Sequence, residues 1–474
     1  MSHRFAAASF AAILAGCGGG AATGPLAPFS HVPLSGTQGS PIAHVVVIVQ
    51  ENRSFDNLFA TFPGADGTTT GLEKVRQGSK YVVKSIALHQ SALVMNTDIG
   101  HCRYSYLTAF DHGKMDAFNL EPQGVCPRGS SGSGPTIGTV AYQYVNPKQI
   151  APYWDLAKQY ALGDHLFQTQ GSGSFTAHQD LIRGNTQIAV GGASLVDTPT
   201  GMPWGCDSSK IARTDLLTLG LHFEEDKGPR PCTTNFKSGS AYKTLRDLLD
   251  ARGVSWKYYS PCFVASPGCG NACTQCAGAL LNAFDVIAPV RNGDEWGTNV
   301  SMPQTNIFND ISKGRLPAVA WVIPTDNDSD HPGTPVDRGP QWVASVVNAI
   351  GKSSYWKTSA IVVVWDDWGG LYDHVKPPFH DKKGGLGFRV PLIVISPYVP
   401  KGTISHTQYE FGSILKYIEQ NWGLGSLETT DRRSTSILNI FNYAQSPRKF
   451  TPIQSPLSPE FFLREPPSSG GDPE

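Results

Sequence analysis

The sequence predicts an α/β fold, a three-layer α/β/α sandwich around a mainly parallel central sheet. The main indication is a set of four short apolar runs with the length and composition of strands buried on both faces. These runs are Val45–Val49, Ala318–Ile323, Ala360–Trp365 and Val390–Ser396. Segments with helical spacing of apolar residues lie among them. Strands that alternate with helices favour parallel pairing beneath a layer of helices on each face.

The first run is the clearest strand of the four. All five of its residues are β-branched, and it ends in the polar residues Glu51 and Asn52. Ser54 can then cap a helix that carries Phe55 and Leu58. Because open α/β sheets bind ligands at the carboxyl ends of their strands, Glu51 and Asn52 are candidate binding residues. A solvated strand end is the alternative interpretation.

The rest of the chain is predicted to form one catalytic domain over residues 41–450. Apolar spacing predicts helices over 147–162, 242–252, 341–350 and 410–422, and loose alternation over 72–88 predicts a hairpin. Residues from about 191 to 310 form an irregular, cysteine-bearing insertion, which we expect to be a lid or part of a substrate pocket. Residues 451–474 are predicted to be a C-terminal tail.

The N-terminus has the pattern of an export signal. Arg4 precedes an apolar, alanine-rich run that is too short to span a bilayer. The next residues, Leu14–Cys17, resemble the cleavage box of bacterial lipoproteins. We therefore expect a signal peptide over 1–16, a lipidated Cys17 that anchors the protein to a membrane, and a flexible tether over 17–40. Ordinary cleavage, with Cys17 incidental, is the alternative. The predicted location is periplasmic or on the cell surface.

Cysteine and charge patterns agree with export. Eight cysteines remain after Cys17, and in an oxidising compartment they can form four disulfides. Nearest-neighbour closure predicts Cys102–Cys126 and Cys206–Cys232. The remaining four favour disulfides over a zinc knot: Cys262, Cys269, Cys273 and Cys276. The net charge of −1 leaves no basic surface for nucleic acid.

Two strand ends carry the candidate metal site. Glu51 and Asn52 follow the first strand, while Asp366 and Asp367 follow the third. If these strands are neighbours, three carboxylates meet at one edge of the sheet. Each pair then repels by roughly 4 kcal/mol at 4 Å in an effective dielectric of about 20. A divalent cation can hold such an oxygen-rich set together, and Ca²⁺, Mg²⁺ or Mn²⁺ fits it better than Zn²⁺ does.

A small-residue run supplies the candidate nucleophile. Residues 171–178, GSGSFTAH, combine a flexible turn with the start of a predicted helix. Ser174 is then expected at the helix N-terminus, where backbone N–H groups and the helix dipole favour an anion. A hydroxyl in that position can attack a phosphorus or sulfur ester. A serine that only caps the helix is the alternative, and Ser172 is a rival nucleophile.

Five segments together resemble one family. They are Glu51–Asp56 (ENRSFD), Gly113–Asp116, Asp330–Pro332, Trp365–Val375 (WDDWGGLYDHV) and Gly387–Pro397. In this order they are similar to the bacterial phosphoesterase family of phospholipases C and acid phosphatases. The resemblance implies an alkaline-phosphatase-like fold and a phosphate-ester substrate, either a phospholipid head group or a phosphomonoester.

The resemblance also implies roles for particular residues. Ser174 matches the nucleophile, and His101 and His331 match histidines that contact the phosphoryl group. The implied ligands of one divalent metal ion are the four strand-end residues, Glu51, Asn52, Asp366 and Asp367. The nucleophile segment departs from the family's phospholipases, which often have Thr-Asp-Pro-Asn-Arg there.

These assignments predict hydrolysis through a phosphoserine intermediate. We expect Ser174 to attack phosphorus and a protonated His331 to serve as general acid for the leaving oxygen. His101 and Lys114 are expected to offset the negative charge of the phosphoryl group, and His374 to contact the substrate or support the site. The alternatives are a sulfatase, whose usual Cys/Ser-x-Pro-x-Arg pattern is absent around Ser174, and a metal-binding scaffold lipoprotein without turnover.

Overall fold

The computed structural model describes most of the chain between Gly39 and Pro466. The described residues are 39–124, 134–188, 194–199, 204–206, 212–218, 223–236, 242–263, 269, 278–378 and 385–466. The predicted signal peptide, Cys17 and most of the tether lie outside them, as do Cys126, Cys273, Cys276 and residues 467–474 of the predicted tail.

In the described part of the chain the central sheet has nine strands. Eight form a continuous row in the following order: β11 (Val300–Ser301), β10 (Trp256–Tyr259), β12 (Val319–Val322), β1 (His44–Gln50), β13 (Ser359–Trp365), β14 (Arg389–Ile395), β6 (Ala161–Phe167) and β15 (Thr403–Ser405). The ninth, β16 (Tyr409–Glu410), also pairs with β6. Strand β1 is parallel to both of its neighbours, β12 and β13. The polar residues that follow β1 and β13 therefore share one edge of the sheet.

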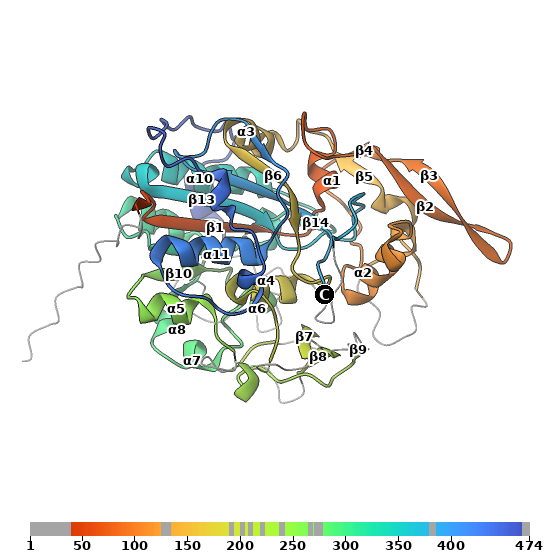
Figure 1. Cartoon of the computed structure of the whole chain (residues 1–474), viewed down its shortest axis with the longest axis horizontal. Helices are drawn as coiled ribbons and strands as arrows, with labels where there is room; N and C mark the ends of the chain where they lie inside the picture. Colours follow the sequence, from red (N-terminus) through yellow and green to blue (C-terminus); the bar gives the residue numbers. More distant parts are fainter. Residues whose placement is uncertain are drawn as a thin grey trace, which may run out of the picture. The chain divides into compact units, whose positions relative to one another are not determined.

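Helices cover both faces of this sheet, as predicted (Figure 1). Helices α3 (Ala151–Gln159) and α10 (Gly339–Gly351) pack together on one face, and α4 (Ser174–Arg183) and α11 (Phe411–Trp422) pack together on the other. The remaining helices are α1 (Phe55–Phe59), α2 (Arg103–Phe110), α5 (Leu245–Ala251), α6 (Gly278–Leu281), α7 (Ala288–Arg291), α8 (Glu295–Thr298), α9 (Asn306–Ser312) and α12 (Pro459–Arg464). The three-layer prediction is confirmed.

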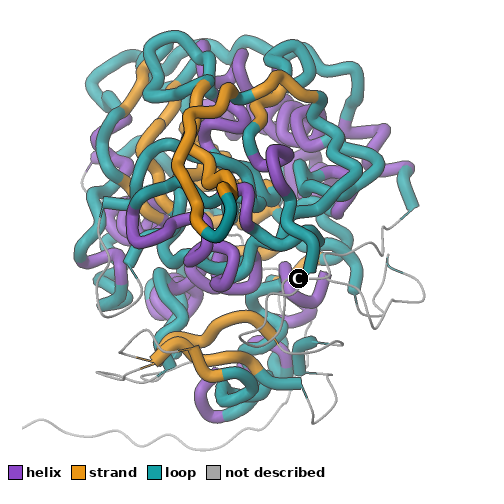
Figure 2. The backbone as a smooth tube through the Cα atoms, turned by 90° about the vertical axis from the view of Figure 1, so that its right-hand side faces the viewer, coloured by secondary structure: helices purple, strands orange, loops and turns teal. Residues whose placement is uncertain are grey.

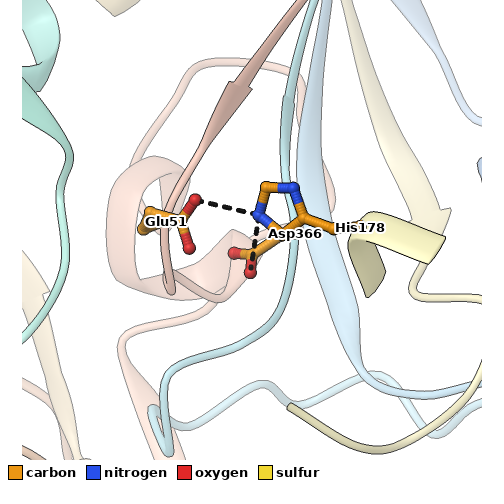
Figure 3. Close-up of side chains that lie close together, drawn as sticks. All are labelled: Glu51, His178 and Asp366. Carbon is orange, nitrogen blue, oxygen red and sulfur yellow. Dashed lines mark hydrogen bonds and ion pairs between the residues drawn. The ribbon is translucent and has the colours of Figure 1, made fainter. Parts of the chain in front are cut away.

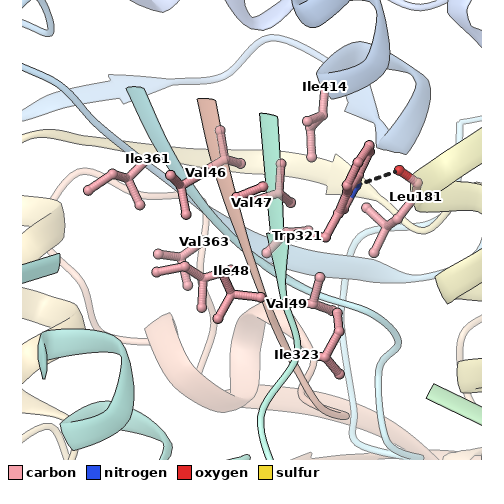
Figure 4. Close-up of a cluster of buried hydrophobic side chains, with 14 of the residues drawn as sticks. Val46, Val47, Ile48, Val49, Leu181, Trp321, Ile323, Ile361, Val363 and Ile414 are labelled. Carbon is pink, nitrogen blue, oxygen red and sulfur yellow. Dashed lines mark hydrogen bonds between the residues drawn. The ribbon is translucent and has the colours of Figure 1, made fainter. Parts of the chain in front are cut away.

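The core forms around the β-branched run of β1. Val47 pairs with Trp321 of β12, whose indole Nε1 donates to the carbonyl of Leu181 in α4 at 3.2 Å. Ile48 pairs with Val363 of β13 and lies on the opposite face, because successive strand residues alternate sides. Figure 4 shows these side chains packed together. Complete burial of both faces explains why the run lacks polar alternation.

Three features of the sheet add detail to the sequence expectation or differ from it. The predicted helix over 147–162 ends at Gln159, and the missed strand β6 begins at Ala161. Strand β14 runs antiparallel to both β13 and β6, so the sheet is mainly but not wholly parallel. The cysteine-bearing insertion also contributes β10 and β11 to the central sheet, since the tyrosine-rich segment 256–259 pairs with β12.

A long hairpin extends from the end of the molecule that carries α2. Strands β2 (Thr70–Gln77) and β3 (Lys80–Ala87) pair antiparallel along their whole length, which confirms the predicted hairpin. It protrudes at the right of Figure 1 and points toward the viewer in Figure 2. The smaller sheets consist of β4 (His89–Ser91) with β5 (Gln143–Val145), and of β7 (Ser194–Pro199), β8 (Thr214–Thr218) and β9 (Phe223–Glu224).

Cysteines pair as the export prediction requires. Cys206 is bonded to Cys232, and Cys262 is bonded to Cys269. The Cys262–Cys269 bond favours disulfides over a zinc knot in that cysteine cluster. Cys102 also takes part in a disulfide, while Cys126, its predicted partner, lies outside the described residues. No helix among the described residues is long and apolar enough to cross a bilayer.

Candidate active site

Asp366 ties together the ends of strands β1 and β13. Its Oδ1 accepts hydrogen bonds from the backbone N–H of Asn52 at 3.1 Å and of Asp367 at 2.7 Å. Asn52 adopts a left-handed backbone conformation, with φ 54°. Gly369 makes this turn possible, because a Cβ there would lie 2.2 Å from the carbonyl oxygen of Asn52. The strand ends thus converge as the sequence predicted.

Ser174 lies against this junction at the first residue of α4. Its hydroxyl accepts a hydrogen bond from Nδ2 of Asn52 at 3.0 Å and donates one to Oδ2 of Asp367 at 3.1 Å. The same Asn52 nitrogen donates to Asp367 at 2.8 Å. All three side chains are buried. The hydroxyl therefore has a fixed orientation at a helix N-terminus, a position that favours an anion.

His178 is a site residue that the sequence analysis missed. Its Nε2 lies 3.1 Å from Oε1 of Glu51 and 3.9 Å from Oδ2 of Asp366, and the three side chains point toward one another (Figure 3). A signal was available, since His178 follows Ser174 by four residues and residues so spaced share a face of a helix. The sequence does not show, however, that α4 packs against the end of β1 and brings His178 to Glu51.

The other nitrogen of His178 explains how the ring is held. The hydroxyl of Tyr258 has one proton, which it donates to the carbonyl of Leu281 at 2.6 Å. At 3.3 Å, Nδ1 of His178 must then donate to that hydroxyl oxygen. Nε2 consequently faces two carboxylates, either as an N–H of a charged imidazolium or as a lone pair. A lone pair in this position requires a cation between it and the carboxylates.

His101 and His331 form a second group of the site. Their ring centroids lie 5.4 Å apart with the planes nearly perpendicular. Nδ1 of His101 donates to the carbonyl of Ile99 at 2.7 Å, and Nδ1 of His331 to that of Pro332 at 2.5 Å. A carbonyl can only accept, so Nδ1 carries the proton in both neutral rings. Nε2 is therefore the nitrogen of each ring that can gain or release a proton.

Asp330 sets the position of the His331 loop. Its Oδ2 accepts hydrogen bonds from the hydroxyl of Tyr153 and from Nε1 of Trp365, both at 2.8 Å. Its carbonyl accepts from Nε of Arg53 at 2.5 Å. The loop is thus fixed to the last residue of β13, directly beside Asp366.

Three other residues proposed from the sequence have different partners. Lys114 is exposed, and its Nζ contacts Oδ2 of Asp111 at 2.9 Å. His374 contacts Asp56 through Nδ1 at 2.7 Å, in a separate polar cluster. Ser172 donates its hydroxyl proton to Asp197. The described contacts of these residues do not join them to the Ser174 cluster, so the geometry favours Ser174 over Ser172.

The comparisons with known proteins agree with this geometry. A family model described as the phosphoesterase family matches residues 42–425, which is most of the chain. The chain belongs to the phosphoesterase family. It is accordingly a hydrolase that acts on phosphoric ester bonds.

Relatives of this phosphoesterase include enzymes named phospholipase C. It is 24% identical to a non-hemolytic phospholipase C of Burkholderia pseudomallei over 80% of this chain and 55% of that protein. It is 25% identical to phospholipase C B of Mycobacterium tuberculosis over 87% of this chain and 80% of that protein. The chain thus spans about half the length of the first relative and most of the second.

One similar solved structure is a protein of the alkaline phosphatase superfamily from Vibrio parahaemolyticus. The superposition has a TM-score of 0.34 at 10% identity and covers 80% of this chain and 65% of that one.

The phosphoesterase site has the donors and the charge that a metal ion requires. Burial and the neighbouring Asp366 carboxylate raise the pKa of Asp367 to about 7, against an opposing effect of His101. Oδ1 of Asn52 and Oδ2 of Asp366 are buried without a hydrogen-bond partner among the described residues. Buried oxygen atoms of this kind are costly unless a ligand satisfies them. With His178, the set fits a divalent cation that accepts both oxygen and nitrogen donors.

Proposed function

We propose that this phosphoesterase is an exported, metal-dependent hydrolase of the phospholipase C or acid phosphatase kind, acting through a phosphoserine at Ser174. The observation that carries the proposal is the Ser174 hydroxyl, which Asn52 and Asp367 orient at the N-terminus of a ten-residue helix. The names of the relatives support a phospholipid or another phosphate ester as the substrate.

We assign the metal to the junction of the two strand ends. Its proposed ligands are Glu51, Asn52, Asp366 and Asp367, with His178 as a nitrogen donor. The imidazole extends the choice of ion to Zn²⁺, beside the Ca²⁺, Mg²⁺ or Mn²⁺ expected from the sequence. When bound, a divalent cation supplies positive charge that lowers the pKa of a neighbouring hydroxyl and offsets charge on phosphoryl oxygens.

The proposed reaction has two steps. The Ser174 hydroxyl gives up its proton along its hydrogen bond to Asp367, and Oγ attacks phosphorus as the ester oxygen leaves. His331, as an imidazolium, gives its Nε2 proton to the leaving oxygen. A water molecule then attacks the phosphoserine, neutral His331 accepts its proton, and Ser174 recovers its own. His101, beside His331, supplies positive charge toward the phosphoryl oxygens.

The decisive test compares two serine variants on two substrates. Ser174→Ala and Ser172→Ala are assayed with a chromogenic phosphate monoester and with a phosphocholine diester. We expect Ser174→Ala to lose about 10³-fold or more in kcat on whichever ester is turned over, while Ser172→Ala stays within several-fold. The relative rates on the two esters distinguish a phosphatase from a phospholipase C.

A trapped intermediate provides an independent readout. Acid quenching during turnover, followed by mass spectrometry of the peptide that spans residues 171–183, should reveal one added phosphoryl group in the wild-type peptide and none in Ser174→Ala. Near-full activity of Ser174→Ala, or a phosphoryl group on another residue, would overturn the assignment. If a metal raises the Tm of the wild type without turnover of either ester, the protein is a scaffold.

Export and membrane attachment form a separate part of the proposal. Leu14–Cys17 supports lipidation of Cys17. Expressed with its own N-terminus in a bacterial host, the wild-type chain should partition with the membranes and carry acyl groups on Cys17. Cys17→Ser should lose both properties, and an unmodified Cys17 in the mature wild type would refute lipid anchoring.

A further inference from the structure

Exposed apolar side chains concentrate on the hairpin β2–β3 and on helix α2. Ten large apolar side chains are exposed among the described residues, and five of them lie on β2, β3 and α2, each 38–53% exposed. The five are Leu72, Tyr81, Val83, Tyr104 and Leu107. Single exposed apolar residues need no explanation, but a concentration of this kind on one projecting element does.

The hairpin register places its three exposed apolar residues on one face. Val83 pairs with Lys74, Tyr81 with Arg76, and Leu72 with Ser85. Paired residues point to the same side of a two-stranded sheet, and so do residues two positions apart along a strand. Leu72, Val83 and Tyr81 therefore share a face with the basic side chains of Lys74 and Arg76.

An ion pair connects this face with the exposed side of α2. Nζ of Lys74 lies 2.5 Å from Oδ2 of Asp111, the C-cap residue of α2. Leu107 precedes Asp111 by four residues and Tyr104 precedes it by seven, a spacing that puts all three on one side of the helix. The hairpin face and this side of α2 form one amphipathic surface, which we call the hairpin–α2 patch.

The charge of the hairpin is opposite to that of the whole chain. Strands β2 and β3 contain four basic residues and one acidic residue, whereas the net charge of the chain is −1. Lys74 pairs with Asp111, but within the described ranges Arg76, Lys80 and Lys84 make no ion pair. All three side chains are exposed, but only Arg76 shares the face of Tyr81 and Val83, whereas Lys80 and Lys84 project from the opposite face of the hairpin. An apolar face that also carries Arg76, on a hairpin whose other face carries two further cations, suits the interface of an anionic bilayer.

In the sequence, the hairpin–α2 patch lies next to a residue of the proposed active site. His101 precedes the N-cap of α2, and Tyr104 lies within the first turn of that helix. Resting on the proposed function, we propose that the hairpin–α2 patch docks the enzyme onto an anionic phospholipid bilayer, so that lipid head groups are presented beside His101. This contact is separate from the proposed acyl anchor at Cys17.

Vesicle binding tests the proposal without depending on turnover. The chain from Pro33 onward forms one compact unit that contains every described residue, and it lacks Cys17. This protein, carrying Ser174→Ala to prevent hydrolysis, is sedimented with phosphatidylcholine vesicles with or without phosphatidylglycerol. We expect binding that increases with phosphatidylglycerol content and weakens as salt is raised.

Three variants locate the contact. Tyr81→Ser/Val83→Ser should weaken binding by about tenfold, through lost apolar burial. Arg76→Gln, on the same face, should weaken it by about fivefold on phosphatidylglycerol vesicles only, through lost attraction to anionic lipid. Leu438→Ser, which removes an exposed apolar side chain elsewhere, is the matched control and should bind like its parent. Circular dichroism checks that each variant folds.

The outcomes separate docking from catalysis. In a chain with Ser174 intact, the hairpin variants should retain their turnover of a soluble ester, so a loss of vesicle binding alone supports docking. Equal binding by all variants, or binding that ignores phosphatidylglycerol, would overturn the proposal. A change from dimer to monomer in Tyr81→Ser/Val83→Ser would also overturn it, because the patch would then join two copies of the chain.

Discussion

Two buried clusters in this protein each combine two carboxylates with a histidine, yet they differ in how their charge is balanced. The first contains Glu51, Asp366 and His178 at the strand ends. The second contains Asp56, Asp373 and His374, beside α1. Their donor atoms are spaced closely enough in both cases to hold a metal ion, so spacing alone does not distinguish them.

The second cluster contains its own permanent cation. Nε of Arg389 lies 2.8 Å from Asp373, and its terminal nitrogen lies 3.3 Å from Asp56. Burial disfavours the charge of this guanidinium, but the two carboxylates raise its pKa above the usual value. Arg389 therefore supplies the positive charge that a metal ion would otherwise have to provide. This cluster braces α1 against the segments around residues 373 and 389.

Asp366 of the first cluster and its neighbour Asp367 differ in this respect. Among the described residues, no lysine or arginine pairs with Asp366 or Asp367, and the ion-pair partner of Asp366 is His178, at 3.9 Å. Same-sign charges in a buried site need compensation. Where the chain supplies an arginine, the cluster is structural. Where the described part of the chain supplies a histidine and buried oxygen atoms without hydrogen-bond partners, the donor set suits a cation from solution.

The largest expected effect comes from removing a strand-end carboxylate. Asp366→Asn should lower kcat/KM by about 10²–10³-fold and abolish any rise in Tm on adding Mn²⁺, because a proposed ligand is lost. Without metal, the Asp366→Asn protein should stay folded, because the substitution removes a buried negative charge. Steady-state kinetics and thermal unfolding with and without metal measure both effects. Asp373→Asn is the matched control, and an equal loss of the metal response in that variant would contradict the distinction.

Removing the internal cation should instead reduce stability. Arg389→Met leaves two buried carboxylates uncompensated, and we expect the free energy of unfolding to fall by about 3–5 kcal/mol. Activity of the folded protein should change little. Urea unfolding provides the measurement. The double variant Arg389→Met/Asp373→Asn should regain part of the loss, and an unchanged stability of Arg389→Met would show that the guanidinium is dispensable.

A smaller effect should follow from the histidine of the first cluster. His178→Gln should weaken Zn²⁺ binding by about tenfold or more and Mg²⁺ binding much less, because imidazole is a preferred ligand of Zn²⁺. Calorimetric titration of the unloaded protein with each metal gives the affinities. Equal losses for both metals would indicate that His178 orients the carboxylates without contacting the ion.

The smallest effect concerns the histidine of the second cluster. Burial disfavours the charge on His374, but its hydrogen bond to Asp56 raises its pKa above the usual value. Its stabilising contribution is therefore present below about pH 6.5 and lost as the pH rises through the raised pKa. We expect His374→Gln to lose about 0.5–1 kcal/mol at pH 6 and less at pH 9. A pH-independent difference would exclude the charge as its source.

The sequence predicted the features that depend on neighbouring residues. The β-branched run identified β1, and Ser54 caps α1 as expected, accepting a hydrogen bond from the backbone N–H of Asn57 at 3.2 Å. Convergence of Glu51 with Asp366 followed from parallel pairing of two buried strands. The Ser174 turn followed from its small residues.

Features that depend on distant packing could not be predicted. Strand β6 was missed because Leu162 continues the helical spacing of the preceding segment. The direction of β14 has no signature in its apolar sequence. The contact of Lys114 with Asp111 at the surface depends on how the end of α2 is folded, which its position in the sequence does not reveal.

The bridge made by Asp366 has a consequence for biosynthesis. Its carboxylate joins two turns that lie more than three hundred residues apart in the chain. A nascent polypeptide that has not yet reached Asp366 cannot close this bridge, so most of the protein must leave the ribosome before Ser174 can meet its full set of partners. An unfinished chain therefore lacks the hydrogen bonds that orient the Ser174 hydroxyl in the complete fold.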